Sequence, residues 1–158
     1  MYSRIMVPLD GSALAECVLP HVTAIAGSVK AKEVVLVRVV NPIRLPASVP
    51  ATGDFGFREK DRRQLEAHRS KTAANYLQQL ADDLVVEDVH ISQTLIEGKV
   101  AESLADYAVS HDVDLIVMAS HGRSGVSRWV MGSVAEKMVR SSCVPVLLVR
   151  APGCEPRG

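Results

Sequence analysis

Residues 115–133 read Leu-Ile-Val-Met-Ala-Ser-His-Gly-Arg-Ser-Gly-Val-Ser-Arg-Trp-Val-Met-Gly-Ser, an apolar strand followed by a glycine-rich loop and a helix start. Gly122 and Gly125 lack a Cβ, so the loop backbone can approach a ligand closely. At Gly132 and Ser133, the free N–H groups and the dipole of a helix N-terminus would favour an anion. The stretch therefore predicts a phosphate-binding loop after a buried strand.

Two common phosphate-binding motifs do not fit this loop. A P-loop needs a lysine directly after its last glycine, but Gly132 is followed by Ser133. The dinucleotide fingerprint G-x-G-x-x-G belongs in the first βα turn, and this loop has neither that spacing nor that position. The sequence therefore disfavours both a P-loop and Rossmann-type NAD binding.

Short β-branched runs alternate with helix-length amphipathic stretches, which is typical of a parallel sheet covered by helices on both faces. The predicted strands are residues 4–9, 33–40, 88–95, 114–118 and 144–149. The predicted fold class is therefore α/β, with a single doubly wound five-stranded sheet.

Mostly apolar residues at helical spacing mark four helices between these strands. Their stripes are Leu14, Val18, Val22 and Ile25; Leu65, Thr72, Tyr76, Leu80 and Leu84; Val100, Leu104 and Ala108; and Val134 and Met138. Ser12 is the predicted N-cap of the first helix, and Pro20 is expected to kink it. Ser133 and Glu136 have the spacing of a capping box at or near the start of the fourth.

Composition limits the class of protein. The 158 residues are 47% hydrophobic and carry 18 basic and 18 acidic side chains, which suits one domain without a strong preference for nucleic acid. No apolar run approaches the ~20 residues of a membrane helix, and the first predicted strand begins at residue 4, so no signal peptide is expected. We therefore expect a cytoplasmic protein that binds neither nucleic acid nor membrane.

The three cysteines, Cys17, Cys143 and Cys154, have no C-x-x-C spacing, so they predict neither a disulfide framework nor a zinc site. Cys17 and Cys143 are interpreted as small buried hydrophobic residues. Residues 41–58 contain three prolines and are expected to form a flexible loop at the carboxyl edge of the sheet. The domain is expected to cover residues 1–150, with a disordered tail at 151–158.

The loop is similar to the G-x2-G-x9-G-[S/T] loop of the universal stress protein family, in its ATP-binding branch. Gly122, the nine-residue gap and Gly132-Ser133 match, whereas Ala119 replaces the first glycine. Alanine would be strained by about 1 kcal/mol at positive φ, but in an extended conformation its methyl group needs only room beside a ligand. Residues 5–12 and 144–149 resemble the family's first and last strands, so the similarity covers nearly the whole chain.

The resemblance implies a Rossmann-like sheet with strand order 3-2-1-4-5, as in the adenine nucleotide α-hydrolases. The turn after the first strand would then face the glycine loop across one crevice. It also implies a nucleotide site in which main-chain groups of Val39 bind adenine. The residues implied around adenine and ribose are Pro8, Leu9, Asp10, Met118 and Ala119, and those implied around the phosphates are Gly122, Gly132, Ser133 and Val134.

Two of these residues keep alternative interpretations, and further polar residues lie within the glycine-rich loop. Asp10 equally fits a turn residue that bonds its own backbone, and Ser133 fits a helix cap. Arg123 and Arg128 lie inside the loop, and we expect at most one of them to bind phosphate. His121 has no carboxylate partner that the sequence identifies, so it is interpreted as a polar loop residue rather than a general base.

The function implied by the resemblance is an ATP-binding regulatory protein of the stress response, with at most slow ATP hydrolysis. AMP or ADP are alternative ligands, and Mg²⁺ would accompany the phosphates. A nucleotide hydrolase or transferase on the same fold is one alternative function, and an interaction module without nucleotide is another. A homodimer is expected through the last strand, Val144 to Val149, together with a regulatory protein partner that the sequence does not identify.

Overall fold

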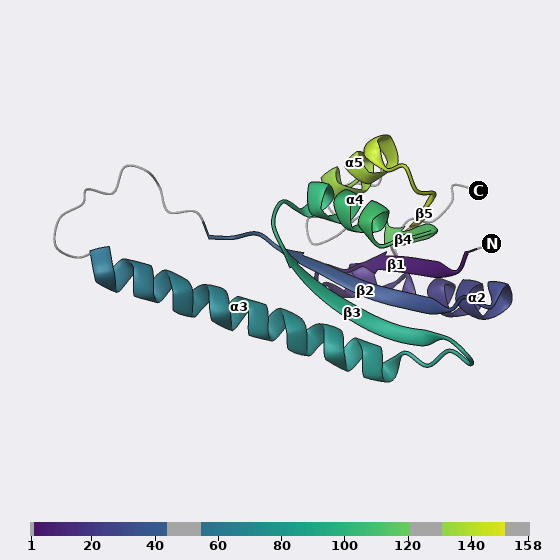
Figure 1. Cartoon of the computed structure of the whole chain (residues 1–158), viewed down its shortest axis with the longest axis horizontal. Coiled ribbons are helices and arrows are strands. Elements are labelled where there is room, and N and C mark those ends of the chain that lie inside the picture. Colours follow the sequence, from purple (N-terminus) through teal and green to yellow (C-terminus); the bar gives the residue numbers. More distant parts are fainter. Residues whose placement is uncertain (1, 44–54, 121–130, 151–158) are drawn as a thin grey trace, which may run out of the picture.

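The computed structural model describes residues 2–43, 55–120 and 131–150. Five parallel strands form one sheet in the order β3-β2-β1-β4-β5, as predicted (Figure 1). The strands are β1 (Arg4–Pro8), β2 (Glu33–Val40), β3 (His90–Glu97), β4 (Leu115–Ala119) and β5 (Val146–Val149). The helices are α1 (Ala13–Glu16), α2 (Leu19–Val29), α3 (Phe55–Asp83), α4 (Val100–Ser110) and α5 (Ser133–Ser141).

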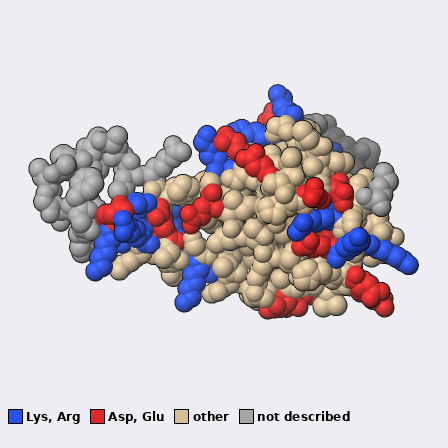
Figure 2. Space-filling view, viewed as in Figure 1, with Lys and Arg blue, Asp and Glu red and all other residues tan. Residues whose placement is uncertain are grey.

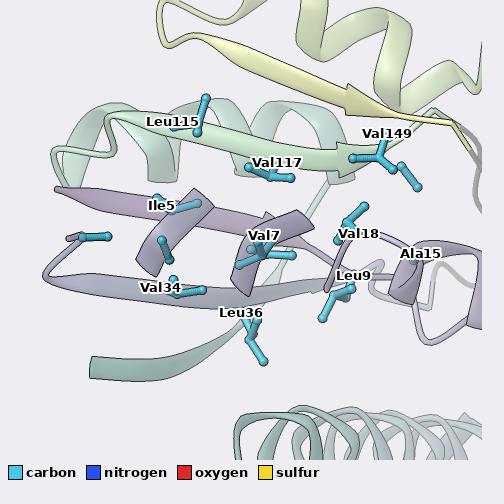
Figure 3. Packing of buried hydrophobic residues seen from close by; sticks show 14 of the residues in the cluster. Ile5, Val7, Leu9, Ala15, Val18, Val34, Leu36, Leu115, Val117 and Val149 are labelled. Carbon is cyan, nitrogen blue, oxygen red and sulfur yellow. The ribbon is translucent and has the colours of Figure 1, made fainter. Parts of the chain in front are cut away.

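The sheet has a hydrophobic core on each face. Helices α1, α2 and α3 cover one face, and α4 and α5 cover the other. Alternation along β2 divides its side chains, so that Leu36 packs under α3 while Val35 and Val37 pack under α4. Figure 3 shows the first core, in which Ile5 and Val7 lie between Leu36 and Val117. Burial on both faces explains the nearly continuous apolar sequence of the central strands.

Two strands begin two residues later than predicted, at His90 and Val146. Asp88 has φ +59°, so a turn occupies the start of the predicted third strand. Pro145 precedes β5, where it accepts a hydrogen bond from the Ile116 N–H at 2.9 Å. Proline has no N–H to donate to a ladder, which makes it suitable for the entry of a strand.

The first predicted helix is divided in two. Ser12 caps α1 as expected, because its Oγ accepts a hydrogen bond from the Ala15 N–H at 3.2 Å. The predicted kink at Pro20 is wrong, since a new helix begins at Leu19 and places Pro20 in its first turn. A proline there loses no helical hydrogen bond, because the first N–H groups have no partner within a helix.

Helix α3 begins at Phe55, inside the segment 41–58 that was expected to be irregular. Residues 44–54 of that segment lie outside the described residues. Ion pairs at helical spacing join Arg62 to Glu59 and Glu66. Hydrogen bonds from Arg62 and Arg63 lower the pKa of the Glu59 carboxyl to about 2. These charges stabilise a helix that runs well past the sheet in Figure 1.

The cysteine interpretation is half wrong. Cys143 is exposed in the connection between α5 and β5, whereas its neighbour Val144 packs against the second core. Cys17 is half-buried, and this burial raises the pKa of its thiol. Cys154 lies outside the described residues.

The face shown in Figure 2 carries basic and acidic side chains in alternation rather than a patch of one sign. The charges gathered along α3 include both signs. In the part of the chain that the structure describes, no helix is long and apolar enough to cross a membrane.

Candidate functional site

A cavity of about 240 Å³ opens at the carboxyl ends of β1, β2 and β4, under helices α4 and α5. The chain winds outward from β1 to β3 in one direction and from β4 to β5 in the other, so the winding reverses between β1 and β4. Ligands of open parallel sheets bind at such a reversal. Nine residues predicted for the site line this cavity: Pro8, Leu9, Asp10, Val39, Met118, Ala119, Gly132, Ser133 and Val134. Gly122 and Arg123 lie outside the described residues.

The turn between β1 and α1 forms one wall. The Leu9 N–H makes the last ladder bond to β2, donating to the Val37 carbonyl at 2.8 Å. Asp10 Oδ1 then accepts hydrogen bonds from the Ser12 N–H at 2.9 Å and from Ser12 Oγ at 2.6 Å. The turn role considered for Asp10 is therefore present, and the same residue also borders the cavity.

The backbone of Val39 is oriented toward the site. In a parallel strand, successive residues direct their N–H and C=O groups to opposite neighbours. Val37 bonds toward β1, and Val40 bonds toward the β3 side, where its carbonyl accepts from the Gly98 N–H at 3.0 Å. Val39 therefore directs its N–H and C=O toward the β1 side, beyond the last ladder bond of Leu9.

The end of β4 forms the floor of the cavity. Ala119 is the last residue of this strand and is only 8% exposed. Its φ is not positive, so alanine causes no backbone strain where the family pattern has glycine. The next residue, Ser120, accepts a hydrogen bond from the Gly132 N–H at 2.9 Å. This bond brings the two ends of the glycine-rich loop together.

The start of α5 lies opposite the β1 turn. Gly132 is the N-cap and Ser133 is the first helical residue, so the predicted capping box is wrong. Glu136 instead forms a surface ion pair with Arg140 at 2.9 Å. The N–H groups of Ser133 and Val134 belong to the first turn, where they have no acceptor within the helix. Ser133 and Val134 are both lining residues of the cavity.

Six further lining residues were not identified from the sequence: Ala15, Val37, Val100, Leu104, Ser120 and Ala135. Val37 was recognisable in principle, because it lies two residues before Val39 on the same face of β2. The others are small or apolar residues that a sequence does not distinguish from core. Asp10 is the one ionisable side chain among the described lining residues, so a largely apolar wall surrounds a single carboxylate.

A five-stranded parallel sheet with helices on both faces and a cavity at its reversal point defines a Rossmann-like α/β domain. The family model of the universal stress proteins matches residues 1–150. The chain therefore belongs to the universal stress protein family.

Individual relatives agree with this assignment. The chain is 28% identical to universal stress protein MJ0577 of Methanocaldococcus jannaschii, over 95% of this chain and 96% of that protein. The solved structure of MJ0577 superimposes with a TM-score of 0.78, covering 97% of this chain and 99% of the other.

Two more distant structures share the fold. A universal stress protein in complex with cAMP gives a TM-score of 0.57 at 21% identity, covering 95% of this chain and 98% of the other. A family protein of Arabidopsis thaliana with AMP bound gives 0.55 at 13% identity, covering 96% and 93%.

Proposed function

We propose that the cavity between the β1 turn and the start of α5 binds an adenine nucleotide, with ATP as the first choice. One observation carries this proposal: residues from opposite ends of the sequence, Pro8 to Asp10 and Gly132 to Val134, line the same cavity at the reversal point of the sheet. A volume of about 240 Å³ approaches the lower end of the ~300–1,000 Å³ typical of small-molecule sites.

The geometry suggests where each part of a nucleotide would lie. The N–H and C=O of Val39 point toward the β1 side, beyond the last ladder bond, and would suit the edge of adenine beside Pro8 and Leu9. Asp10 has a carboxylate that can accept a hydrogen bond from ribose, and Met118 and Ala119 would flank the sugar.

The phosphates would lie at the start of α5. The N–H groups of Ser133 and Val134 suit an anion there, because a helix N-terminus carries partial positive charge. Gly122 and Arg123 would complete this part of the site. The Gly132 N–H already donates to the Ser120 carbonyl, so Gly132 would contribute room beside the phosphates rather than a hydrogen bond. Where Mg²⁺ accompanies the phosphates, Asp10 and Ser133 would offer it oxygen ligands from the cavity wall.

Distant relatives support the class of ligand. Two structures with the same fold hold AMP or cAMP, both of which are adenine nucleotides. The shared part of these ligands is adenosine monophosphate, so the comparison supports the adenosine half of the site more strongly than the choice of ATP.

We further propose a regulatory role rather than rapid catalysis. Asp10 is the one ionisable group in the described wall, and its Oδ1 already accepts two hydrogen bonds from Ser12. A general base must instead be within reach of the proton that it removes. Nucleotide occupancy would then change the conformation or the choice of a regulatory protein partner, in the cytoplasm where ATP is available.

A homodimer through β5 completes the proposal. This strand lies at the edge of the sheet, and Leu147 on it is 38% exposed. An exposed apolar edge strand favours pairing with a second copy about a two-fold axis.

The proposed domain comprises residues 1–150, and residues 151–158 form its tail.

Native mass spectrometry and an ATPase assay separate the competing functions. We expect purified protein to release ATP, ADP or AMP on denaturation and to hydrolyse ATP no faster than about once per minute. Faster turnover would favour the hydrolase or transferase alternative. Protein that carries no nucleotide and gains none on incubation with ATP would favour the interaction module.

A further inference from the structure

Arg38 on β2 lies behind the wall of the candidate site rather than in it. Its neighbours Val37 and Val39 line the cavity, so alternation along the strand places Arg38 on the opposite face of the sheet. This face is the one that α1 and α3 cover. Any effect of Arg38 on the site would therefore be indirect, through the residues of the β1 turn.

The guanidinium of Arg38 lies directly against that turn. A Cβ built on Gly11 would lie 2.9 Å from Arg38 Nη1 and 3.0 Å from Cζ. Gly11 has φ +84°, which glycine adopts without strain. Glycine adopts other conformations as readily, so its own backbone does not fix the turn. Contact with the planar guanidinium restricts the turn from behind, on the side away from the cavity.

Tyr76 of α3 holds the guanidinium in place. The Arg38 Cζ lies 5.2 Å from the centroid of the Tyr76 ring, which is the geometry of a cation–π contact. The Tyr76 hydroxyl donates a hydrogen bond to Glu16 Oε1 on α1 at 2.9 Å. Tyr76 of α3 therefore contacts both Arg38 on β2 and Glu16 on α1, the helix that follows the turn.

The charged groups of this cluster all act on the pKa of the Tyr76 hydroxyl. Burial and the hydrogen bond to Glu16 raise the pKa of Tyr76 well above its usual value, and the carboxylate of Asp10 acts in the same direction. The positive charge of Arg38 acts in the opposite direction on that pKa. Tyr76 therefore stays protonated and keeps donating to Glu16 at neutral pH.

We propose that Arg38 is a positioning residue for nucleotide binding, which fixes the Asp10–Gly11 turn against the cavity while Tyr76 fixes Arg38. This inference rests on the proposed function, because the position of the turn affects affinity only if a nucleotide occupies the cavity. A residue packed behind a binding group holds that group in its binding geometry before the ligand arrives. The ligand then loses less free energy in ordering the site.

Three variants test the inference. Arg38→Met keeps most of the aliphatic stem and removes the guanidinium, whereas Arg38→Lys keeps the charge without the planar group. Arg63→Met is the matched control, since Arg63 lies on α3, is 75% exposed and pairs with Glu59. Each protein is assayed for ATP affinity by calorimetry, for thermal unfolding, and for amide hydrogen exchange without nucleotide.

We expect Arg38→Met to weaken ATP binding roughly tenfold, Arg38→Lys to give an intermediate loss, and Arg63→Met to have no effect. In the nucleotide-free protein, the Ser12 amide, which donates to Asp10 Oδ1, should exchange faster in Arg38→Met than in the control. Faster exchange confined to the turn distinguishes positioning from a general loss of stability.

The outcomes separate this inference from the function on which it rests. If the unmodified protein does not bind ATP, both are overturned. If it binds ATP and Arg38→Met binds equally well, only the positioning role is overturned, and the same holds if exchange rises equally throughout the sheet. Should Arg38→Met fail to fold, Arg38→Lys decides, and unchanged affinity with unchanged exchange at Ser12 would then overturn the role.

Discussion

At the scale of single residues, Ala119 is where this chain departs from its family's loop. The backbone there is extended within β4, so the methyl group adds no strain. We predict that Ala119→Gly changes ATP affinity less than about threefold and lowers stability by about 0.5–1 kcal/mol, because glycine weakens a strand interior. Calorimetry and urea unfolding measure the two effects. Binding more than about tenfold tighter would show that the methyl group obstructs the site.

Gly11 makes the opposite prediction, because its backbone and its surroundings both require glycine. It has φ +84°, and an added Cβ would lie 2.9 Å from Arg38 Nη1. Gly11→Ala should therefore lower the free energy of unfolding by about 1–2 kcal/mol and weaken ATP binding. Gly27→Ala on α2 is the control, since a Cβ there meets only Val86 Cγ1 at 3.9 Å. Equal stability of the two variants in urea would refute this explanation.

At the scale of elements, the contact of α3 with α1 predicts a pH dependence. The pKa of Tyr76 is raised in the folded protein above its ordinary value of 10.0, chiefly by burial. Above that value the unfolded chain loses the proton while the folded chain keeps it. The contribution of Tyr76 to stability is therefore complete below pH 10.0 and is lost as the pH rises further.

Urea unfolding between about pH 9 and about pH 11 measures this loss. Tyr76→Phe should reduce the slope of stability against pH in that window. Tyr107→Phe is the matched control, because its hydroxyl, 3.2 Å from Thr94 Oγ1, belongs to the other face of the sheet. If both variants show the slope of the unmodified protein, α3 is not held to α1 as the contacts indicate.

Much of the element order was readable from the sequence, and the exceptions have physical causes. Central strands are buried on both faces, so their apolar runs are nearly continuous, and β2 was predicted with its observed bounds. Pro20 was misinterpreted because a proline in a first turn and a proline that kinks a helix have the same sequence signature. Ser133 failed as a cap because Gly132 already occupies that position.

Most residues of the candidate site were predicted for a different reason. Its residues at the β1 turn and around the glycine loop follow a family spacing, and the strand order brings them to one cavity. The wall supplied by Val100 and Leu104 was missed, because these residues look like ordinary core positions of a helix. Arg38 was missed as well, since its contacts with Gly11 and Tyr76 join three elements that are remote in the sequence.

At the scale of the whole molecule, the exposed edge of β5 predicts the oligomeric state. We expect sedimentation at micromolar concentration to give twice the chain mass of 17.0 kDa. Leu147→Arg should yield the monomer, because it places a charge on the pairing edge. Val85→Arg is the control, at a position that is 81% exposed and lies between α3 and β3, the strand at the other edge of the sheet. A monomeric unmodified protein, or a dimer that tolerates Leu147→Arg, would place the interface elsewhere.

The most direct test of the nucleotide site is a calorimetric titration of nucleotide-stripped protein with ATP. Gly132→Val adds a branched side chain at the cavity wall beside the start of α5, and Gly27→Val makes the same change on the exposed part of α2. We predict a dissociation constant in the micromolar range for the unmodified protein and for Gly27→Val, and loss of binding in a folded Gly132→Val. No heat of binding from the unmodified protein, or equal binding by Gly132→Val, would contradict a nucleotide site in this cavity.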